Sequence, residues 1–377
     1  GDGAFYIRGN NIYLQNDGTS ETYAGFEADG KSYLNYDGNT KLETTGTGVT
    51  ITGDARVTGI LTVGTASVTI DGSQDFPTIR PTLDLNFAAT KTLDRRITFT
   101  RDSIGTYTDE LGIIQTVPNN VPRFDHDPAT GESLGLLIEE SRTNLVTHSE
   151  DFSNNAWTEN GASESLASSV TAPDGTTGSV YQLIENSSTS GHFMYDSVSV
   201  SSSATYTWSV WMKANTRTYG YMTEGNTQSA TAWFNLSNGT LISVSGTGSP
   251  SATAQKYPNG WVRCTMTFTT GASQTSANVQ FGPHDDGSGF SYAGNGSSGI
   301  YVWGAQAEAG SFATSYIPTS GSTATRSKDD ALITGGSFES WINKNEGTWL
   351  IDFRLLGAGA GLLSISNTGA SVNERYM

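Results

Sequence analysis

Five aromatic side chains in the second half of the chain have the types and spacing needed to bind a sugar. They are Tyr219, Tyr221, Trp233, Phe290 and Tyr292. Aromatic rings stack on the apolar faces of sugar rings, while neighbouring polar groups bind the hydroxyls. Tyr219 and Tyr221 are two residues apart and would share one face of a strand. The pattern predicts a carbohydrate-binding surface, with a hydrophobic core as the alternative. For Trp208, Trp211, Trp261 and Trp303 we expect the core role.

Two short acidic clusters could hold a cation. His284, Asp285 and Asp286 precede Gly287, and the second cluster is 125–127, Asp-His-Asp. Carboxylates on a turn suit Ca²⁺, which prefers oxygen ligands. Neither cluster has the full calcium-loop pattern. The hypothesis is therefore a structural Ca²⁺ on Asp285 and Asp286, with a solvated turn as the alternative, and we expect no other cofactor.

The sequence offers no set of residues typical of catalysis. Glu139 and Glu140 are neighbours that would point to opposite faces of a strand, which favours a polar or salt-bridged edge over a glycosidase pair. There is no Gly-x-Ser-x-Gly motif, and the four histidines lack zinc-site spacing. The lone Cys264 is expected to be a small buried hydrophobe. We expect no catalytic residues and no enzyme activity.

The elements that must position these residues are short strands. Alternation is clearest in 261–268, where Val262, Cys264, Met266 and Phe268 would share one face of a half-buried antiparallel strand. Other aromatic-rich strands are expected at 206–214, 231–236 and 299–306. This series predicts a jelly-roll β-sandwich over residues 149–326.

The first 73 residues have a different, repetitive pattern. Short alternating segments at 5–8, 11–15 and 32–36 are separated by turns such as Asp37-Gly38. Residues 44–64 alternate Val or Ile with Thr and Gly. Each unit has too few apolar side chains for a monomeric core, so two further copies around a threefold axis could bury them. We predict an elongated trimeric β-rich shaft over 1–73, with a flexible linker as the alternative.

Two further segments complete the predicted organisation. Residues 74–148 carry mixed charge and several prolines and are interpreted as an adaptor. Residues 327–377 contain apolar runs at 349–353 and 362–365, and are interpreted as the start of a further β-sandwich that we expect to be incomplete.

Composition limits the possible classes of protein. The 377 residues carry 20 Lys and Arg against 37 Asp and Glu, a net charge of −17, and only 15% are charged. An acidic chain repels phosphate, which excludes nucleic acid as a partner. No apolar run reaches the length of a membrane-spanning helix, so we expect no membrane insertion. An all-β fold remains.

Several segments resemble tail-fibre and receptor-binding proteins of tailed bacteriophages. Residues 135–145 read GLLIEESRTNL, 149–157 read SEDFSNNAW, 302–310 read VWGAQAEAG and 313–319 read ATSYIPT. Residues 41–53, KLETTGTGVTITG, are similar to shaft repeats of marine phage fibres. The resemblance implies a virion fibre, usually a homotrimer, with a jelly-roll head similar to carbohydrate-binding modules. It also implies that the last segment is similar to the start of a laminin-G or concanavalin-like sandwich.

The expected function follows from that resemblance. It implies a virion protein that mediates host attachment, with host surface glycans and other virion tail proteins as its partners. A purely architectural fibre or decoration protein is the first alternative, and a polysaccharide depolymerase is the second.

Overall fold

The computed structural model describes residues 7, 9–17, 21–46, 48–52, 81–227, 230–343, 345–348 and 350–354. The chain divides into two compact units, Gly1–Arg80 and Pro81–Met377. The fold is all-β, as predicted: the helices of the described residues are α1 (Phe87–Thr90), α2 (Gly335–Glu339) and one 3₁₀ turn. None of the helices in this part of the chain is long and apolar enough to cross a membrane.

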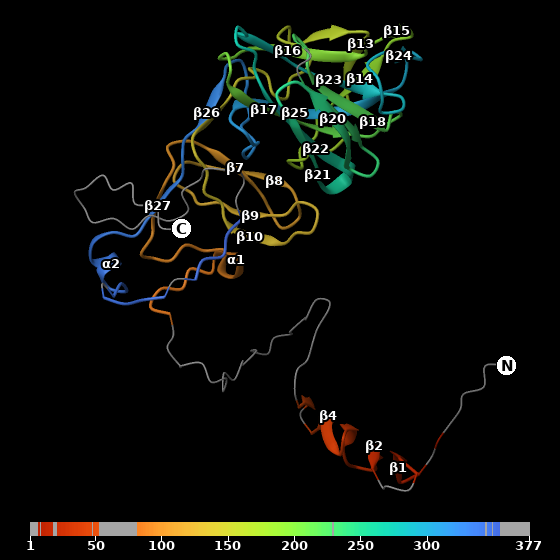
Figure 1. The fold of residues 1–377 in the computed structure, drawn as a ribbon, viewed down its shortest axis with the longest axis vertical. Coiled ribbons are helices and arrows are strands. Elements are labelled where there is room, and N and C mark those ends of the chain that lie inside the picture. The colour runs from red at the N-terminus through yellow and green to blue at the C-terminus, as the bar shows by residue number, and fades with distance from the viewer. Residues whose placement is uncertain are drawn as a thin grey trace, which may run out of the picture. The chain divides into compact units, whose positions relative to one another are not determined.

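The first unit is a five-stranded antiparallel meander (Figure 1). Its strands follow in chain order: β1 (Asn11–Gln15), β2 (Thr22–Glu27), β3 (Ser32–Tyr36), β4 (Asn39–Thr45) and β5 (Gly48–Ile51). The strands predicted at 11–15 and 32–36 are confirmed. Between β3 and β4, Asp37 and Gly38 have φ angles of 50° and 71°, which the tight hairpin turn requires. The repeat at 57–64 and most of 5–8 lie outside the described residues.

This sheet has one apolar face. The strand register places Leu14, Ala24, Leu34, Leu42 and Ile51 side by side across all five strands. Residues directly opposite each other point to the same side of a sheet. The exposed fractions of Leu14, Leu34 and Ile51 are 54%, 49% and 50%. An apolar sheet face normally packs against a second layer, and this face is still about half exposed.

The second unit contains two six-stranded sheets packed face to face. The first sheet contains, in spatial order, β12 (Thr158–Asn160), β16 (Phe193–Ser199), β23 (Ser276–His284), β18 (Tyr219–Glu224), β19 (Ala230–Asn235) and β20 (Thr240–Gly246). The second contains β13 (Ala162–Leu166), β14 (Tyr181–Glu185), β25 (Gly299–Ala309), β17 (Thr205–Lys213), β22 (Trp261–Thr269) and β21 (Ser251–Lys256).

The strand order is that of a jelly roll. Central strands run β16-β23-β18-β19 in one sheet and β14-β25-β17-β22 in the other. The chain therefore crosses between the sheets in two interleaved Greek keys. Strands predicted at 206–214, 231–236, 261–268 and 299–306 correspond to β17, β19, β22 and β25. The predicted jelly-roll sandwich is confirmed.

The core between the sheets is built from the alternation seen in the sequence. Val262, Cys264, Met266 and Phe268 all belong to it. Burial raises the pKa of the Cys264 thiol well above its ordinary value. Trp261, on the other face at the start of β22, is also buried, as expected for a core tryptophan.

A second apolar cluster explains that burial. Trp211, Trp261 and Trp303 lie in it together with Ile114 from the preceding segment and Tyr316 from the following one. The indole of Trp261 donates to the Thr171 carbonyl at 2.9 Å. Chain on both sides of the sandwich therefore packs against the outer face of its second sheet. Trp208, Trp211, Trp261 and Trp303 are all fully buried, which confirms their predicted core role.

Short ladders connect the segments before and after the sandwich. Among them, β6 (Thr98–Thr100) pairs with β27 (Asp330–Leu332), and β11 (Arg142–Asn144) pairs with β26 (Ala324–Arg326). Two hairpins lie within the preceding segment: β7 (Gly105–Thr108) pairs with β8 (Ile114–Val117), and β9 (Phe124–His126) pairs with β10 (Ser133–Leu136). The chain therefore enters and leaves the sandwich side by side. Residues 350–353 form no strand, and 362–365 lie outside the described residues.

A buried ion network lies beside these ladders. Arg123 contacts Glu139 at 2.7 Å and also pairs with Asp329. Asp329 pairs with Arg101 at 3.1 Å, and Arg326 lies 3.4 Å from Glu139. All five side chains are at most 2% exposed. Glu140, by contrast, is exposed and pairs with Arg142. The two neighbouring glutamates thus have the separate, salt-bridged roles that the sequence favoured.

Candidate functional site

The predicted sugar-binding residues lie on the outer face of the first sheet and in the segment that covers it. Met222, Phe234 and Phe281 point into the core. Side chains alternate along a strand, so Tyr221 and Trp233 point outward. They lie opposite each other in the pairing of β18 with β19. In the pairing of β18 with β23, Tyr219 lies opposite His284.

Four of the five predicted aromatic residues form one cluster, with His284 among them. The ring centroids of Tyr221 and Trp233 are 5.1 Å apart, and those of Trp233 and His284 are 4.9 Å apart. Tyr292 lies 4.6 Å from His284, and Phe290 lies 5.5 Å from Tyr221. Tyr219 shares this outer face at the edge of the cluster. Residues separated by seventy positions in the sequence are thus brought together.

Burial divides this cluster into a supporting layer and an accessible layer. The exposed fractions of Tyr221, Trp233 and Tyr292 are 0%, 8% and 6%, whereas Tyr219 and Phe290 are half-buried. Burial also raises the pKa of the Tyr221 hydroxyl, which donates to the carbonyl of His192. In this arrangement Tyr219 and Phe290 keep ring surface that a sugar can reach, and the three buried rings support them. The five-residue sugar site stays a prediction.

Two aromatic residues next to Phe290 were not predicted from the sequence. Phe193 and Tyr195 lie on β16, with ring centroids 6.3 Å apart, and Phe193 lies 5.8 Å from Phe290. Both are half-buried. Their spacing of two residues was a usable signal, because it places both rings on one face of a strand. Phe290, Phe193 and Tyr195 form what we call the aromatic band.

Gly282 allows the covering chain to approach this sheet. It lies on β23 directly opposite Tyr221. A Cβ atom at this position would lie 2.0 Å from the carbonyl oxygen of His192. Any side chain here would therefore displace the backbone that leads into Phe193.

A buried ion pair anchors the covering segment. Arg217 donates to both carboxylate oxygens of Glu185, at 2.8 and 2.6 Å. The Tyr292 hydroxyl and the Asn295 backbone N–H also donate to this carboxylate, at 2.6 and 2.9 Å. Burial opposes ionisation of Glu185, but these hydrogen bonds outweigh it and lower its pKa. In addition, β15 (Thr189–Ser190) pairs with β24 (Tyr292–Ala293). Tyr292 is thus held as a structural ring.

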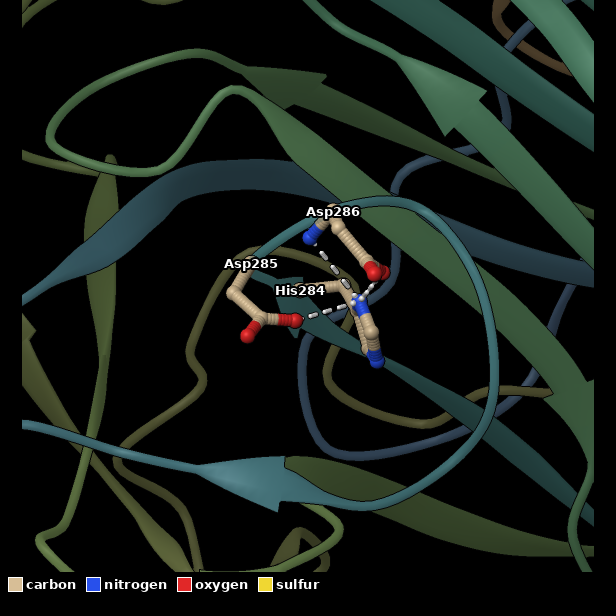
Figure 2. A group of neighbouring side chains, drawn as sticks. All are labelled: His284, Asp285 and Asp286. Carbon is tan, nitrogen blue, oxygen red and sulfur yellow. Dashed lines mark hydrogen bonds and ion pairs between the residues drawn. The ribbon is translucent and has the colours of Figure 1, made fainter.

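The predicted cation ligands lie at the end of β23, with His284 beside them (Figure 2). The Nδ1 atom of His284 is 3.1 Å from a carboxylate oxygen of Asp285 and 3.2 Å from one of Asp286. The same Nδ1 accepts backbone N–H groups of Asp286 and Gly287. Burial lowers the pKa of His284 despite both carboxylates, which favours the neutral imidazole.

The donor set fits Ca²⁺ incompletely. Potential ligand atoms of His284, Asp285 and Asp286 lie within 4.8 Å of one another. Ca²⁺ takes six to eight oxygens, whereas imidazole nitrogen suits transition metals. Water would have to supply most of a calcium shell at Asp285 and Asp286. The calcium site therefore stays a prediction.

The second acidic cluster does not converge in the same way. Asp125 accepts the backbone N–H of Thr108 at 2.7 Å, and His126 lies against the Thr108 carbonyl. Asp127 accepts the N–H groups of Ala129 and Thr130 and so stabilises a turn. The three neighbours therefore serve different local structures.

Comparisons with known proteins give a structural likeness but no match to a family model or a curated sequence. A crystal structure of the enzymatically active domain of tailspike protein 4 from bacteriophage CBA120 is similar, with a TM-score of 0.27 and 12% sequence identity. The match covers 44% of this chain and 21% of that chain. A likeness at this TM-score does not establish a shared fold or function.

Proposed function

We propose that this protein is a fibre protein of a bacteriophage virion that attaches to host cells through glycans bound by its jelly-roll head. The observation that carries the proposal is the aromatic band on the outer face of the first sheet. Phe193 and Tyr195 lie there with Phe290, and all three are half-buried. Partly exposed rings on a rigid sheet provide stacking surface at little cost in conformational entropy.

Polar groups beside the rings support the same proposal. Asp285 and Asp286 are exposed at the end of β23, and Tyr219 begins the strand beside them. Carboxylates and a phenol hydroxyl can bind sugar hydroxyls while a ring stacks on the sugar face. The segments at 135–145 and 302–310 resemble phage fibre proteins, and this resemblance supports the proposed location in a virion.

Assembly is the second part of the proposal. The half-exposed apolar face of the first unit would pack against other copies of the same sheet, and the homotrimer is the proposed state. Repeated heads make weak glycan sites effective, since each further contact is intramolecular. Other virion tail proteins are the proposed partners at the point of attachment.

Substitution in the aromatic band tests the binding proposal. We expect Phe290→Ala and Tyr195→Ala each to weaken glycan binding about two- to tenfold, since one stacked ring contributes about 0.5–1.5 kcal/mol. A glycan array with the full chain identifies the ligand, and titration of that glycan measures the loss. Leu166→Ala is the control, because Leu166 is 52% exposed on the other sheet. An array without binding, or variants that bind like the wild type, would contradict the proposal.

A further inference from the structure

A polar cavity of about 140 Å³ lies where the segments preceding and following the sandwich meet its second sheet. Thr108 on β7 and His126 on β9 line one side, and Tyr257 and Arg263 line the other. Figure 1 shows β7 and β9 beside β21 and β22, the strands that flank this region. The cavity shares no lining residue with the aromatic band.

His126 offers the cavity an unused acceptor. Its Nδ1 lies 3.1 Å from the carbonyl oxygen of Thr108. A carbonyl oxygen can only accept, so Nδ1 carries the proton, and in the neutral ring Nε2 holds a lone pair. The side chain is 5% exposed, and among the described residues Nε2 has no hydrogen-bond partner. Buried polar atoms rarely remain unpaired.

Arg263 offers an unused donor in the same cavity. Its Nη2 atom donates to the Thr314 carbonyl at 2.8 Å and to the Ser209 hydroxyl at 3.1 Å. The guanidinium lies 4.6 Å from the ring centroid of Trp211, so the group is fixed in place. Its Nε–H is buried and has no acceptor within the described part of the chain. Arg263 and His126, which hold this donor and the acceptor, therefore line the same cavity.

Charged side chains of both signs line the cavity, so an ion of either sign would meet a like charge there. Two carboxylates, Asp125 and Glu139, and two guanidiniums, Arg263 and Arg354, line it. Glu139 is paired with Arg123, but Asp125 has no ion pair in the described structure and uses one oxygen to accept the Thr108 N–H. An anion would be repelled by Asp125, and a cation would be repelled by Arg263.

We infer that this cavity binds a small neutral polyhydroxylated group. A hydroxyl can donate to His126 Nε2 or Asp125 and accept from Arg263 Nε at the same time. Trp211 and Tyr257 supply aromatic walls for the carbon skeleton. A cavity of about 150 Å³ accepts one six-membered ring. The size therefore fits a polyol such as glycerol or one edge of a sugar ring.

The ligand chemistry has two possible sources, a free polyol or the terminal residue of a glycan. The second source rests on the proposed function, because it requires that the head meets glycans. Binding of a free polyol does not depend on that proposal. Binding of a free polyol and binding of a terminal glycan residue are therefore tested in separate experiments.

Two variants of the full chain test the cavity. His126→Asn keeps an amide donor near the position of Nδ1 but removes the Nε2 acceptor. Leu134→Phe fills space at the cavity wall without removing a hydrogen bond. Leu166→Phe is the matched control on an exposed strand. Ligand-observed NMR titrations use glycerol and D-glucose as probes, and thermal unfolding confirms that each variant is folded.

We expect at least one probe to bind the wild type, His126→Asn to weaken its binding about tenfold, and Leu134→Phe to abolish it. The control should bind like the wild type. The inference is overturned if neither probe binds, or if either cavity variant that folds binds as the wild type does. If a host glycan loses affinity in Phe290→Ala but not in Leu134→Phe, the terminal-residue source is excluded while the proposed function stands.

Discussion

At the scale of single residues, two carboxylates lie on either side of the short connection between edge strands of the two sheets. Glu159 lies on β12 and Glu164 on β13, and the backbone N–H of Glu164 donates to Glu159 at 2.6 Å. Partial burial and the side chain of Glu164 together raise the pKa of Glu159 to about 7. Because its pKa is raised, Glu159 stays protonated in the folded state up to a pH of about 7. The stability this gives is fully present below the ordinary pKa of 4.5 and is lost as pH rises from there to about 7.

We predict that Glu164→Gln lowers the pKa of Glu159, because it removes the neighbouring negative charge. The variant should also lose less stability than the wild type as pH rises through about 7. Side-chain ¹³C NMR against pH measures the first effect, and urea unfolding at several pH values measures the second. Glu132→Gln, an exposed substitution on a turn, is the control. A Glu159 that titrates in the ordinary range of glutamate in the wild type would refute the prediction.

At the scale of elements, the buried ion network connects strands that are distant in the sequence. Asp329 pairs with both Arg101 and Arg123 and also accepts the backbone N–H of Glu139. Removing one member of a buried ionic group leaves its partners charged without compensation. Asp329 thus connects β27 to Arg101 beside β6, while Glu139 pairs with Arg123 and Arg326 in the same network.

We predict that Asp329→Ala lowers the free energy of unfolding by about 3–5 kcal/mol, because Arg101 and Arg123 stay buried without that carboxylate. Urea unfolding followed by tryptophan fluorescence measures the change. Asp330→Ala is the matched control, since Asp330 forms an ion pair with the exposed Lys328 and should leave stability nearly unchanged. Equal losses in the two variants would show that the buried network is not the cause.

How much the sequence could predict differs between these elements. Local alternation identified β17, β19, β22 and β25, because a strand reveals its buried face at every second residue. It could not reveal which residues cover Trp261 on the other face of β22, since Ile114 and Tyr316 are remote in the sequence. For the site, aromatic type and spacing identified rings that do cluster. The burial of Tyr221 and the pairing of Glu185 with Arg217 depend on tertiary packing, which no local pattern encodes.

At the scale of the whole molecule, each unit bears separately on attachment. The net charge of −17 opposes long-range attraction to an anionic cell envelope. At physiological ionic strength this repulsion is screened beyond about 8 Å. Docking of the second unit would therefore depend on stacking and hydrogen bonds at short range. The first unit contributes the apolar sheet face that the proposed assembly would bury.

We predict that Leu34→Lys disrupts the proposed oligomer, because it places a charge at the centre of the apolar face. The dissociation constant should rise at least about a hundredfold, since burying an unpaired charge is costly. Analytical ultracentrifugation gives the mass. Tyr13→Lys is the control, because Tyr13 is 43% exposed and alternation places it on the opposite face of the same sheet. A monomeric wild type, or a variant that keeps the wild-type mass, would count against assembly through this face.

The paired entry and exit of the sandwich have a mechanical consequence. Tension applied between the chain before β6 and the chain after β27 first reaches the β6–β27 ladder and the buried ions beside it. The sandwich lies between β6 and β27 in the chain, so it bears no tension while the β6–β27 ladder stays paired. A head connected in this way can stay folded while the chain that carries it is pulled.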